Sequence, residues 1–350
     1  MRFDPTCFLP CVLAASALTA SACADGAASS DAADLATSTD ADALADAAPD
    51  LDGAPEVDSA PDVAPPRPEL VVMSYNVMCS FCTFDDHPDW DIDFDHRMAW
   101  VRDTLARHEP DLLGVQELAD IDADHPGQVA TVGGNDGTYG TVYYRHTPAD
   151  EPVEWDYPDA TIYYRASRFD LLDSGQFWLS PTPDVTFAHG WTSGLAFTRL
   201  VVWATLHDKV LDRDLTFATT HFDNNQPNQV NSAPLCLERF APRAAAGPVI
   251  FVGDFNSEPT SDAYGILAHG VDGQGFHFDD AFGLAADAPR IDADDAVPPA
   301  WDEAQRIDHI WLAGATFAVS DWVVDLHTYG DAQQAASDHW AVAATVRIDP

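Results

Sequence analysis

Residues 249–259 read VIFVGDFNSEP, an apolar run that meets the polar residues Asp254 and Asn256 at its end. A short, continuous apolar run of this kind is typical of a strand that is buried on both faces. An Asn-Ser-Glu-Pro-Thr turn at 256–260 follows, and residues 261–268 then have helical character. We therefore predict a buried strand whose polar end opens onto a turn and a helix.

Other apolar runs of the chain meet polar residues in the same way. These residues are Asn76 in VVMSYN, Glu117 in LLGVQE, His221 in LTFATTH, Asp308 in RIDHIWL, and Asp338 and His339 before WAVAATV. Each one alone has an ordinary structural explanation, such as a loop cap, a solvated strand end or a structural histidine. Together they share a single explanation, because strand ends that converge on a cleft can hold a metal ion and an activated water.

The apolar runs also indicate the fold class. Eleven β-rich runs follow residue 68, at 69–78, 112–117, 139–145, 161–165, 171–179, 200–207, 215–221, 248–255, 307–312, 317–324 and 340–348. Residues 97–108 carry Met98, Val101 and Leu105 at helical spacing, and 235–240 are predicted to be part of a further helix. Eleven strands are enough for two sheets, so we expect one α/β domain at 69–350 with two sheets covered by a few helices.

The first 22 residues have the features of a signal peptide. Arg2 gives a positive start, residues 8–18 are apolar but too few to span a bilayer, and Ala20-Ser21-Ala22 fits a signal-peptidase site. The next residue, Cys23, resembles the lipid-modified cysteine of bacterial lipoproteins. We therefore expect export, with the protein either anchored to a membrane through Cys23 or secreted.

Residues 23–68 differ sharply in composition from the rest. After Cys23 they are almost wholly Ala, Asp, Ser, Thr and Pro, and 24–68 hold 11 acidic residues and one arginine. A segment so poor in large apolar side chains cannot offset the entropy of ordering, and its like charges extend it. We expect a disordered tether between the export signal and the domain.

Cys79, Cys82 and Cys236 remain once Cys23 and the signal peptide are set aside. Cys79 and Cys82 have C-x-x-C spacing, but no second pair completes a four-thiolate zinc site and no thioredoxin-like βαβ pattern surrounds them. An exported protein can oxidise its thiols. A structural disulfide or free thiols are therefore favoured over redox catalysis.

The charge balance bears on the partners of the protein. Lys and Arg number 16 against 58 Asp and Glu, a formal net charge of −42, and Lys209 is the one lysine. Binding to extended nucleic acid uses rows of basic side chains, so a chain of this charge makes such a partner unlikely. The same balance excludes a basic nucleic-acid-binding surface of the usual kind.

The order and wording of the motifs resemble the endonuclease/exonuclease/phosphatase superfamily of DNase I-like, metal-dependent phosphohydrolases. The motifs are SYN at 74–76, GVQE at 114–117, TH at 220–221, GDFNSEP at 253–259, RIDHIW at 306–311 and SDH at 337–339. Residues 159–185 are similar to an uncharacterised bacterial branch. The resemblance implies a four-layered α/β sandwich, with two mixed β-sheets packed face to face and helices outside.

The resemblance also implies roles for these residues. Glu117 would be the principal ligand of Mg²⁺ or Mn²⁺, with Asn76 beside it and Asp338 completing the metal surroundings. Asp254 would position and deprotonate the attacking water, and Asn256 would fix its direction. Asp308 would hold His339 in its working tautomer, and His221 would bind the phosphate from the other side. A neighbouring anion raises the pKa of a histidine, which favours its phosphate-stabilising form.

Arg97 and Arg199 are candidate substrate contacts, and each could equally be a structural ion-pair partner. The chain departs from the branch at Phe222-Asp223-Asn224, where Leu-Asp-His is common, and at Gln229, where an arginine is expected. One phosphate clamp would then be missing. The stretch 122–159 is also longer than expected and would form a loop beside the cleft.

These features together predict an exported, monomeric, metal-dependent phosphoric ester hydrolase that acts on a small or lipid-linked phosphate ester, as a monoesterase or a diesterase. Its contact with a membrane would be limited to the lipid anchor. One alternative is an extracellular nuclease of the same fold, which the charge disfavours. A second is a non-catalytic binding module, which would not need to retain the complete set of polar residues.

Overall fold

The computed structural model describes residues 68–79, 82, 94–118, 128–134, 136–144, 159–192, 198–273, 275–294 and 298–349. The predicted signal peptide and nearly all of the predicted tether lie outside these residues, as does most of the predicted loop at 122–159. Every described helix and strand belongs to one compact unit, Ala64–Pro350. None of the described helices is both long and apolar enough to cross a membrane.

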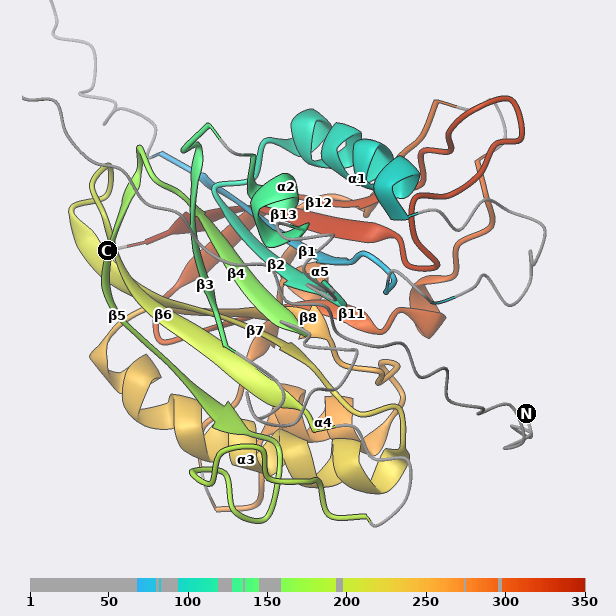
Figure 1. Cartoon of the computed structure of the whole chain (residues 1–350). Helices are drawn as coiled ribbons and strands as arrows, with labels where there is room; N and C mark the ends of the chain where they lie inside the picture. The colour runs from blue at the N-terminus through green and yellow to red at the C-terminus, as the bar shows by residue number, and fades with distance from the viewer. Residues whose placement is uncertain are drawn as a thin grey trace, which may run out of the picture. The chain divides into compact units, whose positions relative to one another are not determined.

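Two sheets form the centre of this unit (Figure 1). In the first sheet the strand order is β10 (Arg290–Asp292), β12 (Phe317–Asp325), β13 (Ala341–Ile348), β1 (Leu70–Asn76), β2 (Leu112–Gln116), β4 (Ala160–Arg165) and β3 (Tyr139–Tyr143). In the second it is β5 (Phe169–Trp178), β6 (Leu200–Asp208), β7 (Arg213–His221), β8 (Val249–Asp254), β11 (Asp308–Ala313) and β9 (Asp279–Asp280). Both sheets are mixed, because β1–β2 and β7–β8 are parallel pairs among antiparallel ones.

Helices cover the outer face of each sheet (Figure 1). The helices are α1 (Phe94–His108), α2 (Gln128–Gly133), α3 (Gln226–Ala246), α4 (Asp262–His269), α5 (Ala281–Leu284) and the 3₁₀ turn η1 (Glu303–Gln305). In α1, Met98, Val101 and Leu105 pack on the first sheet, as their spacing predicts. Leu237 and Phe240 of α3 pack on the second sheet. The four-layered α/β sandwich is thus confirmed.

The largest hydrophobic core lies between the two sheets, where Val72, Leu112, Val202, Phe217 and Val252 are fully buried. Gly114 of GVQE marks the closest approach, because a Cβ atom there would collide with the side chains of Thr219 and Val252 from the other sheet. Tight packing at this point fixes β2 against β7 and β8. The polar residues at the ends of these strands are therefore brought together.

All eleven predicted strands are present, within a few residues of their expected bounds, and two short strands, β9 and β10, were not predicted. The helix predicted at 261–268 is α4, which Ser261 caps by accepting a hydrogen bond from the backbone N–H of Tyr264. The segment 235–240 is part of a helix of 21 residues. The sequence understates α3 because Pro234 and Pro242 lie inside it, and interior proline ordinarily breaks a helix.

Candidate active site

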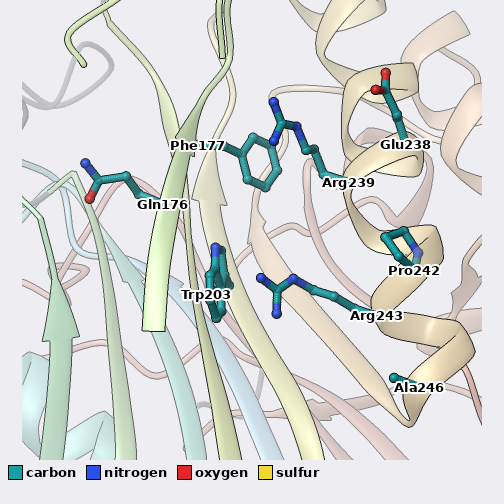
Figure 2. A pocket seen from close by; sticks show the side chains of 8 residues that line it. All are labelled: Gln176, Phe177, Trp203, Glu238, Arg239, Pro242, Arg243 and Ala246. Atoms are coloured by element: carbon teal, nitrogen blue, oxygen red, sulfur yellow. The ribbon is translucent and has the colours of Figure 1, made fainter. Parts of the chain in front are cut away.

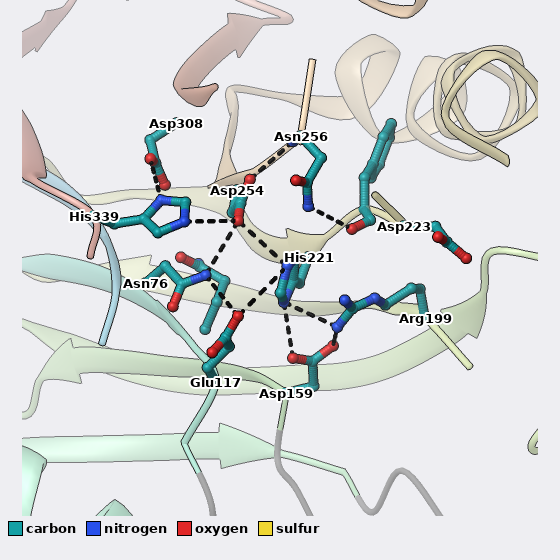
Figure 3. A network of polar contacts seen from close by, with 12 residues as sticks. Asn76, Glu117, Asp159, Arg199, His221, Asp223, Asp254, Asn256, Asp308 and His339 are labelled. Carbon is teal, nitrogen blue, oxygen red and sulfur yellow. Dashed lines mark hydrogen bonds and ion pairs between the residues drawn. The ribbon is translucent and has the colours of Figure 1, made fainter. Parts of the chain in front are cut away.

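Strand ends from both sheets meet at one edge of the sandwich (Figure 3). Strands β1, β2, β7 and β8 contribute their C-terminal ends, and their antiparallel neighbours β4, β11 and β13 contribute their N-terminal ends. The side chains gathered there are those of Asn76, Glu117, Asp159, Arg199, His221, Asp254, Asn256, Asp308 and His339. The structure thus brings together the residues that the sequence predicts at strand ends.

Glu117 and Asp254 share a single amide donor. Nδ2 of Asn76 donates to Oε1 of Glu117 and to Oδ2 of Asp254, at 3.1 Å in each case. Oδ1 of Asn76 accepts from the backbone N–H of Met78 at 3.0 Å, which fixes the orientation of the amide. In this structure Asn76 therefore positions two carboxylates. Carboxylate oxygens that converge in this way suit a hard divalent cation such as Mg²⁺ or Mn²⁺.

Asp254 is the centre of the cluster and is buried. Its Oδ1 accepts from the backbone N–H of Asn256 at 2.8 Å, and its Oδ2 lies 3.3 Å from Nε2 of His221 and 3.6 Å from Nε2 of His339. Burial alone would raise the pKa of Asp254, but the two histidines outweigh it and hold that pKa below its usual value. Asp254 is therefore an anion at neutral pH, as a group that orients water must be.

His221 is backed by a second carboxylate that the sequence analysis missed. Its Nδ1 lies 2.9 Å from Oδ1 of Asp159, and Arg199 contacts both partners. Burial and Arg199 both lower the pKa of His221, yet Asp159 and Asp254 raise it overall to about 9. The imidazole is consequently a cation at neutral pH. Asp159 directly precedes β4, so its signal is an acid before a strand, the same pattern that Asp338 shows.

His339 and Asp308 form the matching pair on the other side. Nδ1 of His339 lies 2.8 Å from Oδ2 of Asp308, as the resemblance implies. Burial lowers the pKa of His339, but Asp308 and Asp254 raise it well above its usual value. Burial also raises the pKa of Asp308 to about 6, although His339 opposes this. The two histidines therefore flank Asp254 with their Nε2 atoms, each held by a carboxylate at Nδ1.

Asn256 and Asp338 lie beside this core. Asn256 adopts a left-handed backbone with φ of 47°, and its Nδ2 donates to the carbonyl of Phe222 at 3.0 Å. Gln229, which replaces an expected arginine, donates to the carbonyl of Asn256 at 2.8 Å and so supports the GDFN turn. Asp338 is exposed and interacts electrostatically with His339 and Glu117. Asp338 therefore lies near the carboxylate of Glu117, and its predicted role beside a metal ion stays a prediction.

Residues 73–339 contain every predicted site residue, and they match the model of the Endonuclease/Exonuclease/phosphatase family. The chain belongs to this family. Its members are phosphoester hydrolases, and the chain is of that type. None of the curated proteins matched the chain.

Solved structures of this family share the fold. A protein of Bacteroides vulgatus described as an endonuclease/exonuclease/phosphatase is 22% identical with a TM-score of 0.63, over 81% of this chain and 100% of that chain. A mannosyl-6-phosphatase of Bacteroides thetaiotaomicron is 24% identical with a TM-score of 0.62, over 79% and 99%. The human Nocturnin catalytic domain with bound sulfate is 18% identical with a TM-score of 0.55, over 81% and 96%.

One predicted substrate contact of this family member is corrected by the structure. Arg97 has no exposed surface, and its guanidinium donates to the backbone carbonyls of Val77, Met78, Cys79 and Ala336 at 2.8–3.1 Å. A side chain enclosed in this way cannot reach a substrate. The prediction failed because a sequence does not show on which side of a helix a long side chain ends. Arg97 instead ties α1 to two segments. One is 77–79, whose last residue contacts Glu117, and the other is the segment at Ala336 just before Asp338.

Arg199 lies behind His221 and is nearly buried, with its charge directed at Asp159. The sequence analysis left two roles open for Arg199, a substrate contact and a structural ion-pair partner. The structure shows the ion pair, in which Arg199 contacts Asp159 and His221 and does not extend into solvent.

A separate cavity of about 500 Å³ lies between α3 and strands β5 and β6 (Figure 2). Its lining residues are Gln176, Phe177, Trp203, Glu238, Arg239, Pro242, Arg243 and Ala246. None of them is a predicted site residue. The guanidinium carbon of Arg243 lies 3.4 Å from the ring centroid of Trp203, and Arg239 pairs with Asp184 at 2.7 Å. Both arginines are thus engaged in packing the second sheet against α3.

Proposed function

We propose that this protein is a phosphoric ester hydrolase that depends on Mg²⁺ or Mn²⁺ and acts on a small or lipid-linked phosphate ester. The observation that carries the proposal is a buried carboxylate, Asp254, between the Nε2 atoms of two histidines whose pKa values are raised by their carboxylate partners. A tetrahedral, negatively charged phosphoryl group fits such surroundings, because its oxygens need positive partners as charge develops. The sulfate bound to human Nocturnin and the presence of a mannosyl-6-phosphatase among the similar structures support this class of substrate.

Glu117 would hold the divalent cation, with Asn76 and Asp338 beside it. A bound cation supplies positive charge to the phosphoryl oxygens and makes a water molecule more acidic. Asn76 keeps the carboxylates of Glu117 and Asp254 in place, and Asp254 accepts a proton from the attacking water. His221 and His339 donate hydrogen bonds to the phosphoryl oxygens through Nε2, while Asp159 and Asp308 keep Nδ1 protonated.

The direct test is a substrate screen of the purified chain with Mg²⁺, with Mn²⁺ and with EDTA. The panel is bis-nitrophenyl phosphate, nitrophenyl phosphate, sphingomyelin, inositol phosphates, nucleotides and plasmid DNA. We expect metal-dependent release of product from at least one small or lipid-linked ester. Full activity in EDTA, or no hydrolysis of any ester with either metal, would contradict the proposal.

The matched variant for this screen is Glu117→Gln, which keeps the size of the side chain and removes its charge. We expect turnover to be abolished, because an amide cannot neutralise a divalent cation. The free energy of unfolding should fall by only about 1 kcal/mol, because one of the two N–H groups that donate to the Glu117 carboxylate loses its acceptor. Hydrolysis at the parental rate under saturating Mg²⁺ would show that the metal assignment is wrong.

We also propose that the protein is exported and anchored to a membrane through Cys23. The support is the arrangement of a short apolar run, small residues and a cysteine at the expected cleavage site. Mass spectrometry of the mature N-terminus in the native host tests it. A lipid mass on Cys23 is expected, and an unmodified Cys23 in the culture medium would favour secretion instead.

A further inference from the structure

The loop that follows β1 is closed by a disulfide between Cys79 and Cys82. The sequence analysis left two alternatives for these cysteines, free thiols or a disulfide, and the structure shows the disulfide. The backbone N–H of Cys82 also donates to the carbonyl of Cys79 at 3.2 Å, so the loop is a tight turn. Cys79 is buried, whereas Cys82 is partly accessible to solvent. A small thiol reagent can therefore reach the bond from the Cys82 side.

This turn holds one oxygen of Glu117. The backbone N–H of Cys79 donates to Oε2 of Glu117 at 2.8 Å, while Asn76 binds Oε1. Both sulfur atoms also lie within 4.8 Å of a carboxylate oxygen of Glu117. The carboxylate is thus fixed at both oxygens by the segment that runs from the end of β1 into the disulfide turn.

The backbone on both sides of this contact is strained. Met78 has φ of 56° and Glu117 has φ of 63°, which is the left-handed region that residues other than glycine rarely adopt. Such a conformation is unfavourable for these residues and persists only where its surroundings enforce it. At Met78 the enforcing contacts are Arg97, which binds the carbonyls at 77–79, and the disulfide immediately after it.

We propose that the Cys79–Cys82 disulfide is a positioning element for Glu117: it keeps the N–H of Cys79 directed at Oε2 and thereby keeps the carboxylate ready to bind the divalent cation. This inference rests on the proposed role of Glu117 as a metal ligand. Reduction by a dithiol breaks the S–S bond, gives two cysteine thiols and converts the reagent to its cyclic disulfide. Arg97 and the Asn76 side chain then remain as restraints on this segment, and the carboxylate loses its restraint at Oε2 while Asn76 still binds Oε1.

The consequence is weaker metal binding rather than slower chemistry, because the turn contacts Glu117 directly, whereas the two histidines beside Asp254 are held by Asp159 and Asp308. The experiment measures the dissociation constant of Mn²⁺, by electron paramagnetic resonance without substrate, for the full chain before and after reduction with dithiothreitol. Loss of an outer contact to a ligand typically weakens metal binding about 10- to 100-fold. We expect a weakening in that range, reversed by reoxidation, with kcat at saturating metal within about twofold of the parent.

Variants separate the disulfide from other effects of the reagent. Cys79→Ser/Cys82→Ser should bind Mn²⁺ as weakly as the reduced parent and should not respond to dithiothreitol. Cys236→Ala is the matched control, because Cys236 is a buried free thiol away from the turn, and it should respond like the parent. Circular dichroism establishes that each protein is folded, and the reduction and reoxidation of the parent decide the question if the double variant is not.

An unchanged Mn²⁺ dissociation constant after complete reduction, verified by alkylation of both thiols, overturns the proposal. A fall in kcat at saturating metal with unaltered Mn²⁺ binding does so as well. Because binding is measured without substrate, a protein that binds Mn²⁺ in this redox-dependent way but cleaves no phosphate ester would refute the proposed function alone. An oxidised parent that binds no Mn²⁺ would overturn both.

Discussion

Asp254 receives contacts from four separate parts of the chain: Asn76, His221, His339 and the backbone of Asn256. Replacement by asparagine keeps its shape but removes the charge that both histidines face. We expect Asp254→Asn to lower kcat about 10²- to 10⁴-fold, the usual effect of losing a general base. Steady-state kinetics with the substrate found in the screen provide the measurement.

The control for this variant is Asp173→Asn, an exposed carboxylate on β5 outside the cluster, which should leave kcat unchanged. Thermal melting distinguishes chemistry from folding. If Asp254→Asn lost stability and activity in proportion, the residue would be structural and its assignment to the reaction would fail.

The junction of β12 and α1 carries a buried ion cluster that includes none of the predicted site residues. Asp325 ends β12 and accepts hydrogen bonds from Arg107, His108 and His327 at 2.8–3.1 Å. Burial alone would raise the pKa of Asp325, but these partners hold it at about 2. The carboxylate therefore favours the folded state whenever it is ionised.

The sign of the pH effect follows from this lowered pKa. Above the unfolded-state value of about 3.9 the stabilisation is fully present, and it is lost as the pH falls from about 4 to about 2. The loss should be about 2 kcal/mol. Urea unfolding at several pH values measures this loss. In Asp325→Asn the free energy of unfolding should change less with pH between about 4 and about 2. An equal slope in that variant would show that other groups cause the acid sensitivity.

Helix α3 is attached to strand β6 of the second sheet by a stacked pair, Arg243 on Trp203 (Figure 2). Burial lowers the pKa of Arg243, which shows that its guanidinium is partly removed from water. A desolvated cation–π pair contributes roughly 0.5–2 kcal/mol. We expect Arg243→Ala to reduce the free energy of unfolding by that amount.

A double-mutant cycle isolates the stacking contribution. Trp203→Leu and the double variant complete the cycle, and Arg102→Ala, an exposed arginine on α1, is the control. Strictly additive losses in chemical denaturation would mean that the two side chains contribute independently and that the stacking itself adds nothing.

At the scale of the whole molecule, net charge acts on any extended substrate. The chain carries −42 overall, and Arg97, one of the few candidate phosphate contacts, is enclosed by backbone carbonyls. Each phosphate of long DNA placed against uncompensated carboxylates is repelled over a Debye length of about 10 Å at 0.1 M salt. Under the proposed function, a small ester would need only a cation held at Glu117 and the two histidines.

We therefore expect small esters to be cleaved far better than duplex DNA at low ionic strength, with added salt narrowing the difference. Initial rates on a nitrophenyl ester and on plasmid DNA, compared across a salt series, measure this. Efficient plasmid degradation at low salt that declines as salt rises would instead favour the nuclease alternative.

The sequence by itself determined where the eleven longer strands lie and which polar residues stand at their ends. Asn76, Glu117, His221, Asp254, Asp308 and His339 could be found because an apolar run followed by an acid, amide or imidazole is a local pattern. Burial of strands on both faces leaves their ends as the natural place for polar groups. The order of these motifs along the chain then indicated one family, and the resemblance to that family predicted the four-layered sandwich.

Only the tertiary structure decided which side chains meet. Asp159 backs His221 across 62 residues of sequence, and Arg97 closes on carbonyls as far away as Ala336. The length of α3 was hidden by its interior prolines, which packing against the second sheet overrides. The end of a strand can be recognised from the residues around it. The partner of a long charged side chain instead depends on how the two sheets and their helices pack, because an unpaired charge is too costly to bury.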